Sequence, residues 1–175
     1  MLLTREDLQN TRAKYKAAFD AQKMKILVCA GTGCVAGGAL DIYAELVRLI
    51  GEKGICCDVD LEHEPHDDPV GVKKSGCHGF CEMGPLMRIE PQGWLYIKVR
   101  PEDCEEIVAA TIVGGRFLDR LAYKKNGQAY PTQEGIPFYQ KQTRLVLEHC
   151  GHIDATSIKE YLAVGGYAAL EKALF

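Results

Sequence analysis

The sequence lacks the features that would direct it to a membrane, to nucleic acid or to secretion. No apolar run approaches the roughly 20 residues that a membrane-spanning helix needs. The first 23 residues are rich in charged side chains and do not form a secretory signal. A net charge of −3 gives no reason to expect nucleic acid or an anionic membrane as a partner. We therefore expect a cytoplasmic protein that is not inserted in a membrane.

Two familiar motifs of redox and nucleotide-binding proteins are also missing. The chain has no Cys-x-x-Cys pair, which thiol–disulfide oxidoreductases use, and no G-x-G-x-x-G, which would mark a dinucleotide site. It does hold eight cysteines among its 175 residues, and 47% of its residues are hydrophobic, enough for a buried core. Because thiols stay reduced in the cytoplasm, clustered cysteines there indicate metal or redox chemistry rather than disulfides.

Four of the cysteines form two pairs in glycine-rich stretches. Cys29 and Cys34 enclose four residues in "CAGTGC", and Cys77 and Cys81 enclose three in "SGCHGFCEMGP". Glycine lets the backbone approach sulfur closely and turn its N–H groups toward it. Four convergent thiolates suit Zn²⁺ or an iron–sulfur cluster. Both spacings are longer than a two-residue zinc knuckle, which favours a [2Fe–2S] cluster with each iron held by one pair; a zinc site and thiol–disulfide exchange are the alternatives.

The other candidate ligands have simpler explanations. Cys56 and Cys57 are adjacent on an expected strand, so their side chains point to opposite faces and cannot easily join one site. Cys104 falls on the apolar face of an expected helix, and Cys150 precedes a glycine at an expected helix end, so both are interpreted as structural. His78 lies between two expected ligands and is assigned a supporting or surface role, because four cysteines already complete the site.

The order of expected elements gives the fold class. Helices are expected up to about residue 22 and over 37–54 and 101–115, and strands over 24–30, 56–63, 86–91 and 94–99, with an acidic loop over 62–71. A βαβ unit followed by ββα predicts an α/β, thioredoxin-like fold: a mixed four-stranded sheet with flanking helices. A βαβ crossover carries the loops that hold the two cysteine pairs to the same end of the sheet.

The pattern "CAGTGC…SGCHGFCEMGPLMRIEP…WLYIKVRPED" closely resembles the thioredoxin-like [2Fe–2S] ferredoxin family. This resemblance implies that Cys29, Cys34, Cys77 and Cys81 ligate a [2Fe–2S] cluster. Members stand alone, serve as the small iron–sulfur subunit of complex I-type dehydrogenases, or are fused to the flavin-binding subunit of soluble NAD(P)-linked hydrogenases and formate dehydrogenases. The tail "GIPFYQKQTRLVLEHCGHID…SIKEYLAVGGYAAL" resembles the opening of that FMN- and NAD(H)-binding subunit.

The two resemblances together predict the domain organisation. We expect an N-terminal helix over 1–23, a thioredoxin-like ferredoxin domain over 24–115, a linker or arm over 116–136, and the truncated start of a flavoprotein domain over 137–175. The C-terminal part is expected to form short helices over 136–151 and 154–175, the second capped by Asp154. The chain is then a fragment, and the FMN, NAD(P) and [4Fe–4S] sites of the parent subunit lie outside it.

The expected function is one-electron transfer without a catalytic site in this chain. No general acid, base or nucleophile is needed. The parent is expected to be an NAD(P)H-linked oxidoreductase, and the partners to be other iron–sulfur or flavin subunits of a redox complex; association of copies of this chain stays open. The competing hypothesis from another class is a zinc-stabilised thioredoxin-like interaction module, which would be colourless.

Overall fold

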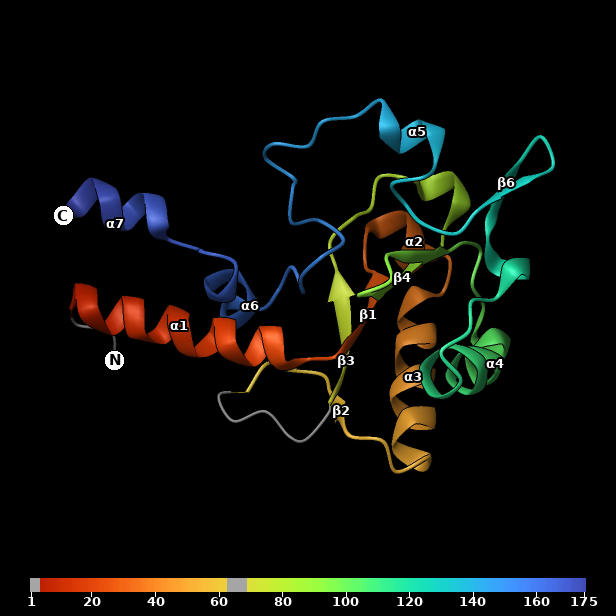
Figure 1. The fold of residues 1–175 in the computed structure, drawn as a ribbon, viewed down its shortest axis with the longest axis horizontal. Coiled ribbons are helices and arrows are strands. Elements are labelled where there is room, and N and C mark those ends of the chain that lie inside the picture. The colour runs from red at the N-terminus through yellow and green to blue at the C-terminus, as the bar shows by residue number, and fades with distance from the viewer. Residues whose placement is uncertain (1–3, 63–68) are drawn as a thin grey trace.

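The computed structural model describes residues 4–62 and 69–175. The N-terminal half comprises α1 (Arg5–Ala21), β1 (Met24–Cys29), α2 (Thr32–Ala36), α3 (Ala39–Glu52), β2 (Cys57–Asp58), β3 (Val70–Ser75), η1 (Cys81–Met83), β4 (Met87–Glu90) and β5 (Trp94–Tyr96). The second half comprises η2 (Pro101–Asp103), α4 (Cys104–Ile107), η3 (Val108–Val113), η4 (Asp119–Leu121), β6 (Tyr123–Lys125), β7 (Gln128–Tyr130), α5 (Pro137–Gln140), α6 (Ile158–Ala163) and α7 (Ala168–Leu174). Figure 1 shows their arrangement.

The main sheet is mixed, with the strand order β2-β3-β1-β4-β5. Strands β2, β3 and β1 run parallel to one another, β4 is antiparallel to β1, and β5 is antiparallel to β4. The predicted thioredoxin-like α/β class is therefore confirmed. The described residues form a five-stranded sheet rather than the predicted four-stranded one, because the expected strand over 56–63 shortens to β2 and β3 appears where a loop over 62–71 and the start of the cysteine turn were expected. Residues 63–68, which belong to the expected strand over 56–63 and the expected loop over 62–71, lie outside the described residues.

One face of the sheet is covered by α3 and the helical segment made of α4 and η3, which lie side by side (Figure 1). Ile42, Leu46 and Ile50 recur every four residues on α3 and are buried. Cys104, Ile107 and Val108 supply the matching buried side chains from α4 and η3. The predicted helix over 101–115 thus exists, with a 3-10 first turn and a π-helical second half.

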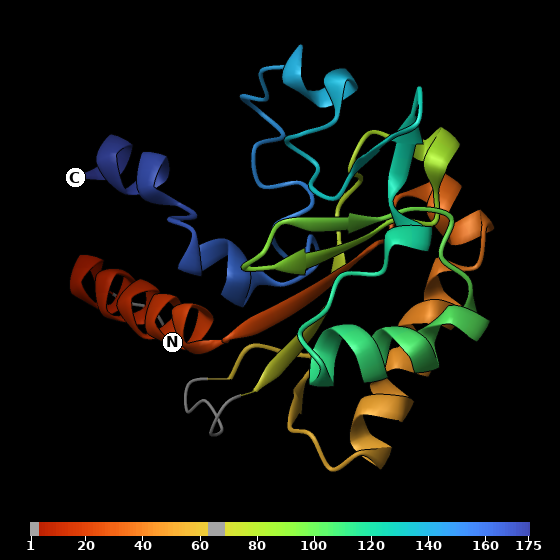
Figure 2. The same cartoon turned by 45° about the vertical axis from the view of Figure 1, so that its right-hand side comes forward.

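The opposite face of the sheet is turned toward the C-terminal part of the chain (Figure 2), and charged side chains of the two parts meet there. On β3, Lys74 lies over the ring of Tyr43 in α3, whereas its neighbour Lys73 faces the other way and pairs with Glu160 of α6. Arg88 of β4 pairs with Glu134 at 2.7 Å. Residues after 130 therefore complete a face of the sheet that its own strands leave charged.

A capping box marks the start of helix α1, which lies within the helix expected over 1–23. The Thr4 hydroxyl oxygen accepts a hydrogen bond from the Asp7 N–H, and the Asp7 carboxylate accepts one from the Thr4 N–H. The helix packs against α6, with Ala18 buried among Leu61 and Ala163. Its outer turns are tied to α7 by Glu171, which accepts hydrogen bonds from the helix side chains Arg5, Gln9 and Arg12.

The segment expected to be an extended arm contains the β6–β7 hairpin, and Leu118 and Leu121 from it enter the main core. Helix is confined to α5 within the helix expected over 136–151, and residues 141–157 form turns and irregular backbone. The next helix begins at Ile158 and is capped by Ser157 rather than by Asp154, which instead forms an isolated bridge with Ser75. In the described part of the chain, no helix combines the length and hydrophobicity that crossing a membrane requires.

Candidate metal centre

The two cysteine loops leave the sheet at the same end, as predicted. Cys29 is the last residue of β1, and it stands beside Ser75, the last residue of the parallel strand β3. The amide of Ala30 donates to the carbonyl oxygen of Ser75 at 2.9 Å, joining the starts of both loops. The strand that delivers the second loop is thus β3, which the sequence interpretation placed in a loop.

The structure brings all four predicted thiols together. The Sγ atom of Cys77 lies 3.7 Å from that of Cys81. The side chains of Cys34 and Cys77 both lower the pKa of Cys29, which places Cys29 between the two pairs. Cys29 and Cys34 are buried, whereas Cys77 and Cys81 are exposed. Within residues 4–62 and 69–175, no three His, Cys, Asp or Glu side chains are placed to hold a single metal ion.

Glycines lie directly against these sulfur atoms and leave little room for a side chain. A Cβ atom on Gly84 would lie 2.7 Å from Cys34 Sγ, and one on Gly31 would lie 3.1 Å from Cys77 Sγ. Each loop therefore places a glycine against a cysteine of the other loop. This interlocking explains why the two stretches are rich in glycine, and it is what a group held jointly by both loops requires.

Backbone N–H groups point at the sulfur atoms. Gly79 N–H donates to Cys77 Sγ at 3.3 Å. The contact with Cys34, aided by the N–H groups of His78 and Gly31, lowers the pKa of Cys29 to about 6 despite its burial. The same contact raises the pKa of Cys34, and burial adds to that effect. Burial also raises the pKa of Cys77, against the Gly79 donor. The N–H donors thus stabilise negative charge on Cys29 and oppose the effect of burial on Cys77.

His78 does not face the thiols as a fifth ligand. Its ring is fully buried, with Nε2 at 2.8 Å from Ser75 Oγ and Nδ1 at 3.1 Å from Gln133 Oε1. Both ring nitrogens therefore have partners, and burial lowers the pKa of the imidazole to about 4, which keeps it neutral. This agrees with the supporting role expected from the sequence, since the side chain anchors the loop between the two exposed cysteines.

The remaining cysteines stay outside the thiol group. Cys104 is fully buried, and its Sγ lies 3.8 Å from the carbonyl oxygen of Ile42. Cys150 lies against Gly76, where an added Cβ would come within 3.2 Å of its Sγ. Cys56 and Cys57 are half-buried on the far side of β3. These placements match the structural roles assigned from the sequence.

Residues that hold the second loop were missed by sequence reasoning. Tyr139 Oη donates to the carbonyl oxygen of His78 at 3.0 Å, and Arg144 donates to the same oxygen. Phe138 stacks on Phe80 with ring centroids 4.9 Å apart. All these contacts come from more than 50 residues away, and no local motif marks them.

Comparisons with known proteins agree on one family. The sequence model of the family described as "Thioredoxin-like [2Fe-2S] ferredoxin" matches residues 14–111. A 2Fe-2S ferredoxin of Aquifex aeolicus is 39% identical over 54 residues, which are 31% of this chain and 49% of that protein. A 2Fe-2S ferredoxin of Clostridium pasteurianum is 36% identical over 62 residues, 35% of this chain and 61% of that protein. The matches thus span about half to three fifths of these curated relatives.

Among solved structures, the wild-type thioredoxin-like [2Fe-2S] ferredoxin of Aquifex aeolicus is similar to this chain, with 25% identity and a TM-score of 0.47. The superposition covers 60% of this chain and 100% of that one.

Proposed function

The chain belongs to the thioredoxin-like [2Fe-2S] ferredoxin family, and from this premise we propose that it transfers one electron at a time through a [2Fe–2S] cluster held by Cys29, Cys34, Cys77 and Cys81. The single observation that carries the proposal is the meeting of the two cysteine loops at one end of the sheet, where Gly31 lies against Cys77, Gly84 lies against Cys34, and the Sγ atoms of Cys77 and Cys81 are 3.7 Å apart. When bound, the cluster would supply a one-electron redox couple that no side chain of this protein provides.

The residues of the chain contribute in three ways. The four cysteines would hold the cluster as thiolates, Cys29 and Cys34 being buried and Cys77 and Cys81 exposed. Gly31 and Gly84 keep space for sulfur where a side chain would collide. The N–H of Gly79 stabilises the charge on Cys77. Because Cys77 and Cys81 are exposed, we propose that electrons enter and leave on their side of the site.

The wider setting is also a proposal. The resemblance of residues 135–170 to a flavoprotein subunit supports a place in the NAD(P)H-oxidising or NAD(P)⁺-reducing part of a multi-subunit hydrogenase or formate dehydrogenase. FMN, NAD(P) and [4Fe–4S] clusters would then belong to the rest of that complex, in the cytoplasm. On this proposal, NADH or NADPH alone leaves the visible spectrum of the oxidised chain unchanged, whereas a flavin-containing NAD(P)H dehydrogenase subunit allows its reduction.

Metal analysis of the full chain tests the cluster directly. Protein purified without oxygen should contain iron and acid-labile sulfide in equal amounts, show the red-brown absorption of an oxidised cluster, and give an electron paramagnetic resonance signal after one-electron reduction. Zinc with a colourless solution would instead support the interaction module. Two reactive thiols with no metal would support thiol exchange.

A further inference from the structure

The loop that carries the two exposed cysteines is held from outside the part of the chain that matches the family. The family match ends at residue 111, and the contacts to this loop come from residues 133–151. His78 is bound by Gln133, and Phe80 stacks on Phe138. Each of the three residues between Cys77 and Cys81 therefore meets this later segment, since Gly79 lies against Arg144, where an added Cβ would come within 3.3 Å of Nη2.

One peptide group connects the segment to a sulfur atom. The carbonyl oxygen of His78 and the N–H of Gly79 belong to the same peptide plane and point in opposite directions, since this bond is trans. Tyr139 and Arg144 donate to its oxygen, and its N–H donates to Cys77 Sγ at 3.3 Å. Hydrogen bonds in such a chain polarise one another, so a cationic donor at the oxygen strengthens the N–H as a donor to sulfur.

Arg144 is itself held in place for this contact. A second guanidinium nitrogen, Nη1, donates to the carbonyl oxygen of Cys150 at 3.2 Å, and the guanidinium carbon lies 5.4 Å from the centre of the Tyr139 ring. Tyr139 is buried, and Arg144 is half-buried. Gly79 has φ +81°, a backbone conformation that glycine adopts without strain, and its missing side chain leaves the space that Arg144 occupies.

We propose that Arg144 and Tyr139 are positioning residues of the cluster site: by binding the His78 carbonyl oxygen, they fix the Gly79 N–H on Cys77 and raise the reduction potential of the cluster. This inference rests on the proposed function. The reduced cluster carries one more negative charge than the oxidised one, and a stronger donor at a ligating sulfur stabilises it more. The same two residues hold the loop still whether or not a cluster is bound.

The experiment uses the full chain and two conservative variants, Arg144→Gln and Tyr139→Phe, with Arg144→Lys as the rescue variant. Lys141→Gln is the matched control, because it removes the same charge from an exposed position in the same segment. Two quantities are measured on each sample: deuterium exchange of residues 76–81 by mass spectrometry, and the midpoint potential by titration followed in the visible spectrum. Iron content and the thermal midpoint are recorded beside them.

For Arg144→Gln we expect exchange in residues 76–81 to accelerate on the order of tenfold, the effect of losing one charge-assisted hydrogen bond. The potential should fall, with a smaller fall for Tyr139→Phe, a partial return for Arg144→Lys and little change for Lys141→Gln. Wild-type exchange and potential in both Arg144→Gln and Tyr139→Phe would overturn the proposal, as would an equal fall in potential for Lys141→Gln. If Arg144→Gln fails to fold, Tyr139→Phe decides by the same criteria. A chain without iron refutes the proposed function, whereas the exchange data still report on the loop.

Discussion

The two cysteine loops reach the same site by different means. The first, with Cys29 and Cys34, is buried and is fixed by elements inside the family unit, since Cys29 ends β1 and Cys34 lies in α2. The second, with Cys77 and Cys81, is exposed at its sulfur atoms and is anchored through His78 and Phe80 to residues after 130. Burial holds the first loop, and hydrogen bonds and ring stacking from a distant segment hold the second.

This difference assigns different tasks to the two loops. A buried thiol pair excludes water and fixes the position of the site relative to the sheet. An exposed pair allows a partner to approach, but its loop cannot rely on burial of the cysteines for its shape. The second loop therefore needs support from elsewhere, and the residues after 130 supply it. The same part of the chain also pairs with the charged face of the sheet, through Glu134 and Glu160.

The largest expected effect follows from removing a ligand in either loop. Cys29→Ser and Cys77→Ser should both lose nearly all bound iron, because four thiolates are needed to complete the site. Cys56→Ser, at the residue before the edge strand β2, is the matched control and should keep the iron content of the wild type. Iron and sulfide analysis with the visible spectrum checks this, and a full complement of iron in Cys77→Ser would remove Cys77 from the ligand set.

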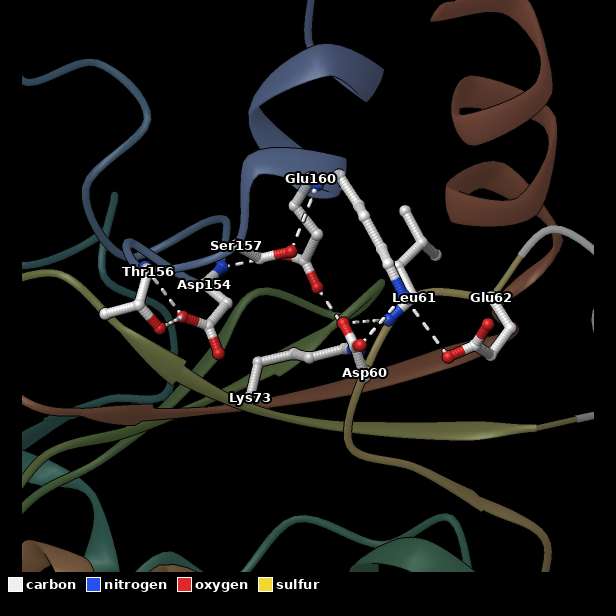
Figure 3. A network of polar contacts seen from close by, with 9 residues as sticks. Asp60, Leu61, Glu62, Lys73, Asp154, Thr156, Ser157 and Glu160 are labelled. Atoms are coloured by element: carbon white, nitrogen blue, oxygen red, sulfur yellow. Dashed lines mark hydrogen bonds and ion pairs between the residues drawn. The ribbon is translucent and has the colours of Figure 1, made fainter. Parts of the chain in front are cut away.

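A large loss of stability is expected from the buried ion pair beneath the second loop. Figure 3 shows Lys73 of β3 directed toward Glu160 of α6. Lys73 Nζ lies 3.2 Å from Glu160 Oε1, and both side chains are 1% exposed. Lys73→Met removes the cation that faces the buried Glu160 carboxylate and leaves it the hydrogen bond from the Asp154 N–H, which should cost roughly 3–5 kcal/mol in the free energy of unfolding. Urea denaturation of the full chain measures this cost.

The control for this pair is an exposed one. Lys16→Met breaks the contact of Lys16 with Asp20, in which both side chains are more than half exposed, and should cost less than about 1 kcal/mol. Lys73→Met combined with Glu160→Gln should recover much of the loss, because the buried charge is then gone. An equal, small effect of Lys73→Met and Lys16→Met would show that the C-terminal segment does not brace β3.

A smaller effect is expected where the two loops interlock. A Cβ atom on Gly84 would lie 2.7 Å from Cys34 Sγ and 3.2 Å from the carbonyl oxygen of Cys81. Gly84→Ala should therefore cost roughly 1–3 kcal/mol and lower the iron content, as overpacking does elsewhere. Gly51→Ala, in α3 with nothing within 4 Å of an added Cβ, should be neutral or slightly stabilising. Thermal unfolding with iron analysis compares the two, and equal behaviour would contradict the interlocking of the loops.

The smallest effect concerns acid stability at the junction with the C-terminal segment. Burial alone would raise the pKa of Glu90, but His152 and Arg88 lower it to about 2. A carboxyl group with a folded-state pKa below its unfolded value of about 4.3 stabilises the fold above that value and loses its contribution as the pH falls toward 2. Glu90→Gln should therefore flatten the decline in stability between about pH 4 and pH 2. An unchanged pH profile, measured by urea denaturation at each pH, would mean that this contact does not support the segment.

The first loop, the strand before it and the helix that covers that strand were predictable because their signals are local. An apolar run ending in Cys29 predicts a buried strand, and the spacing of Ile42, Leu46 and Ile50 predicts the helix that covers it. The convergence of the four cysteines followed from the parallel crossover alone.

The second loop and its support were not predictable in the same way. Lys73 and Lys74 make β3 look polar, and its burial becomes intelligible only with Glu160, which lies 87 positions away. Likewise, nothing near Tyr139 or Arg144 indicates that both bind the His78 carbonyl oxygen. A charged or polar residue reveals its place in a core only through its partner, and these partners are distant in sequence.

X-ray absorption at the iron K-edge of the full chain tests the central claim most directly, because it reports the atoms bound to each iron. The account predicts sulfur as the only ligand element and a neighbouring iron at short distance. Nitrogen or oxygen ligation in the wild-type chain, or iron without a second iron beside it, would contradict the joint hold of the two loops on a [2Fe–2S] cluster.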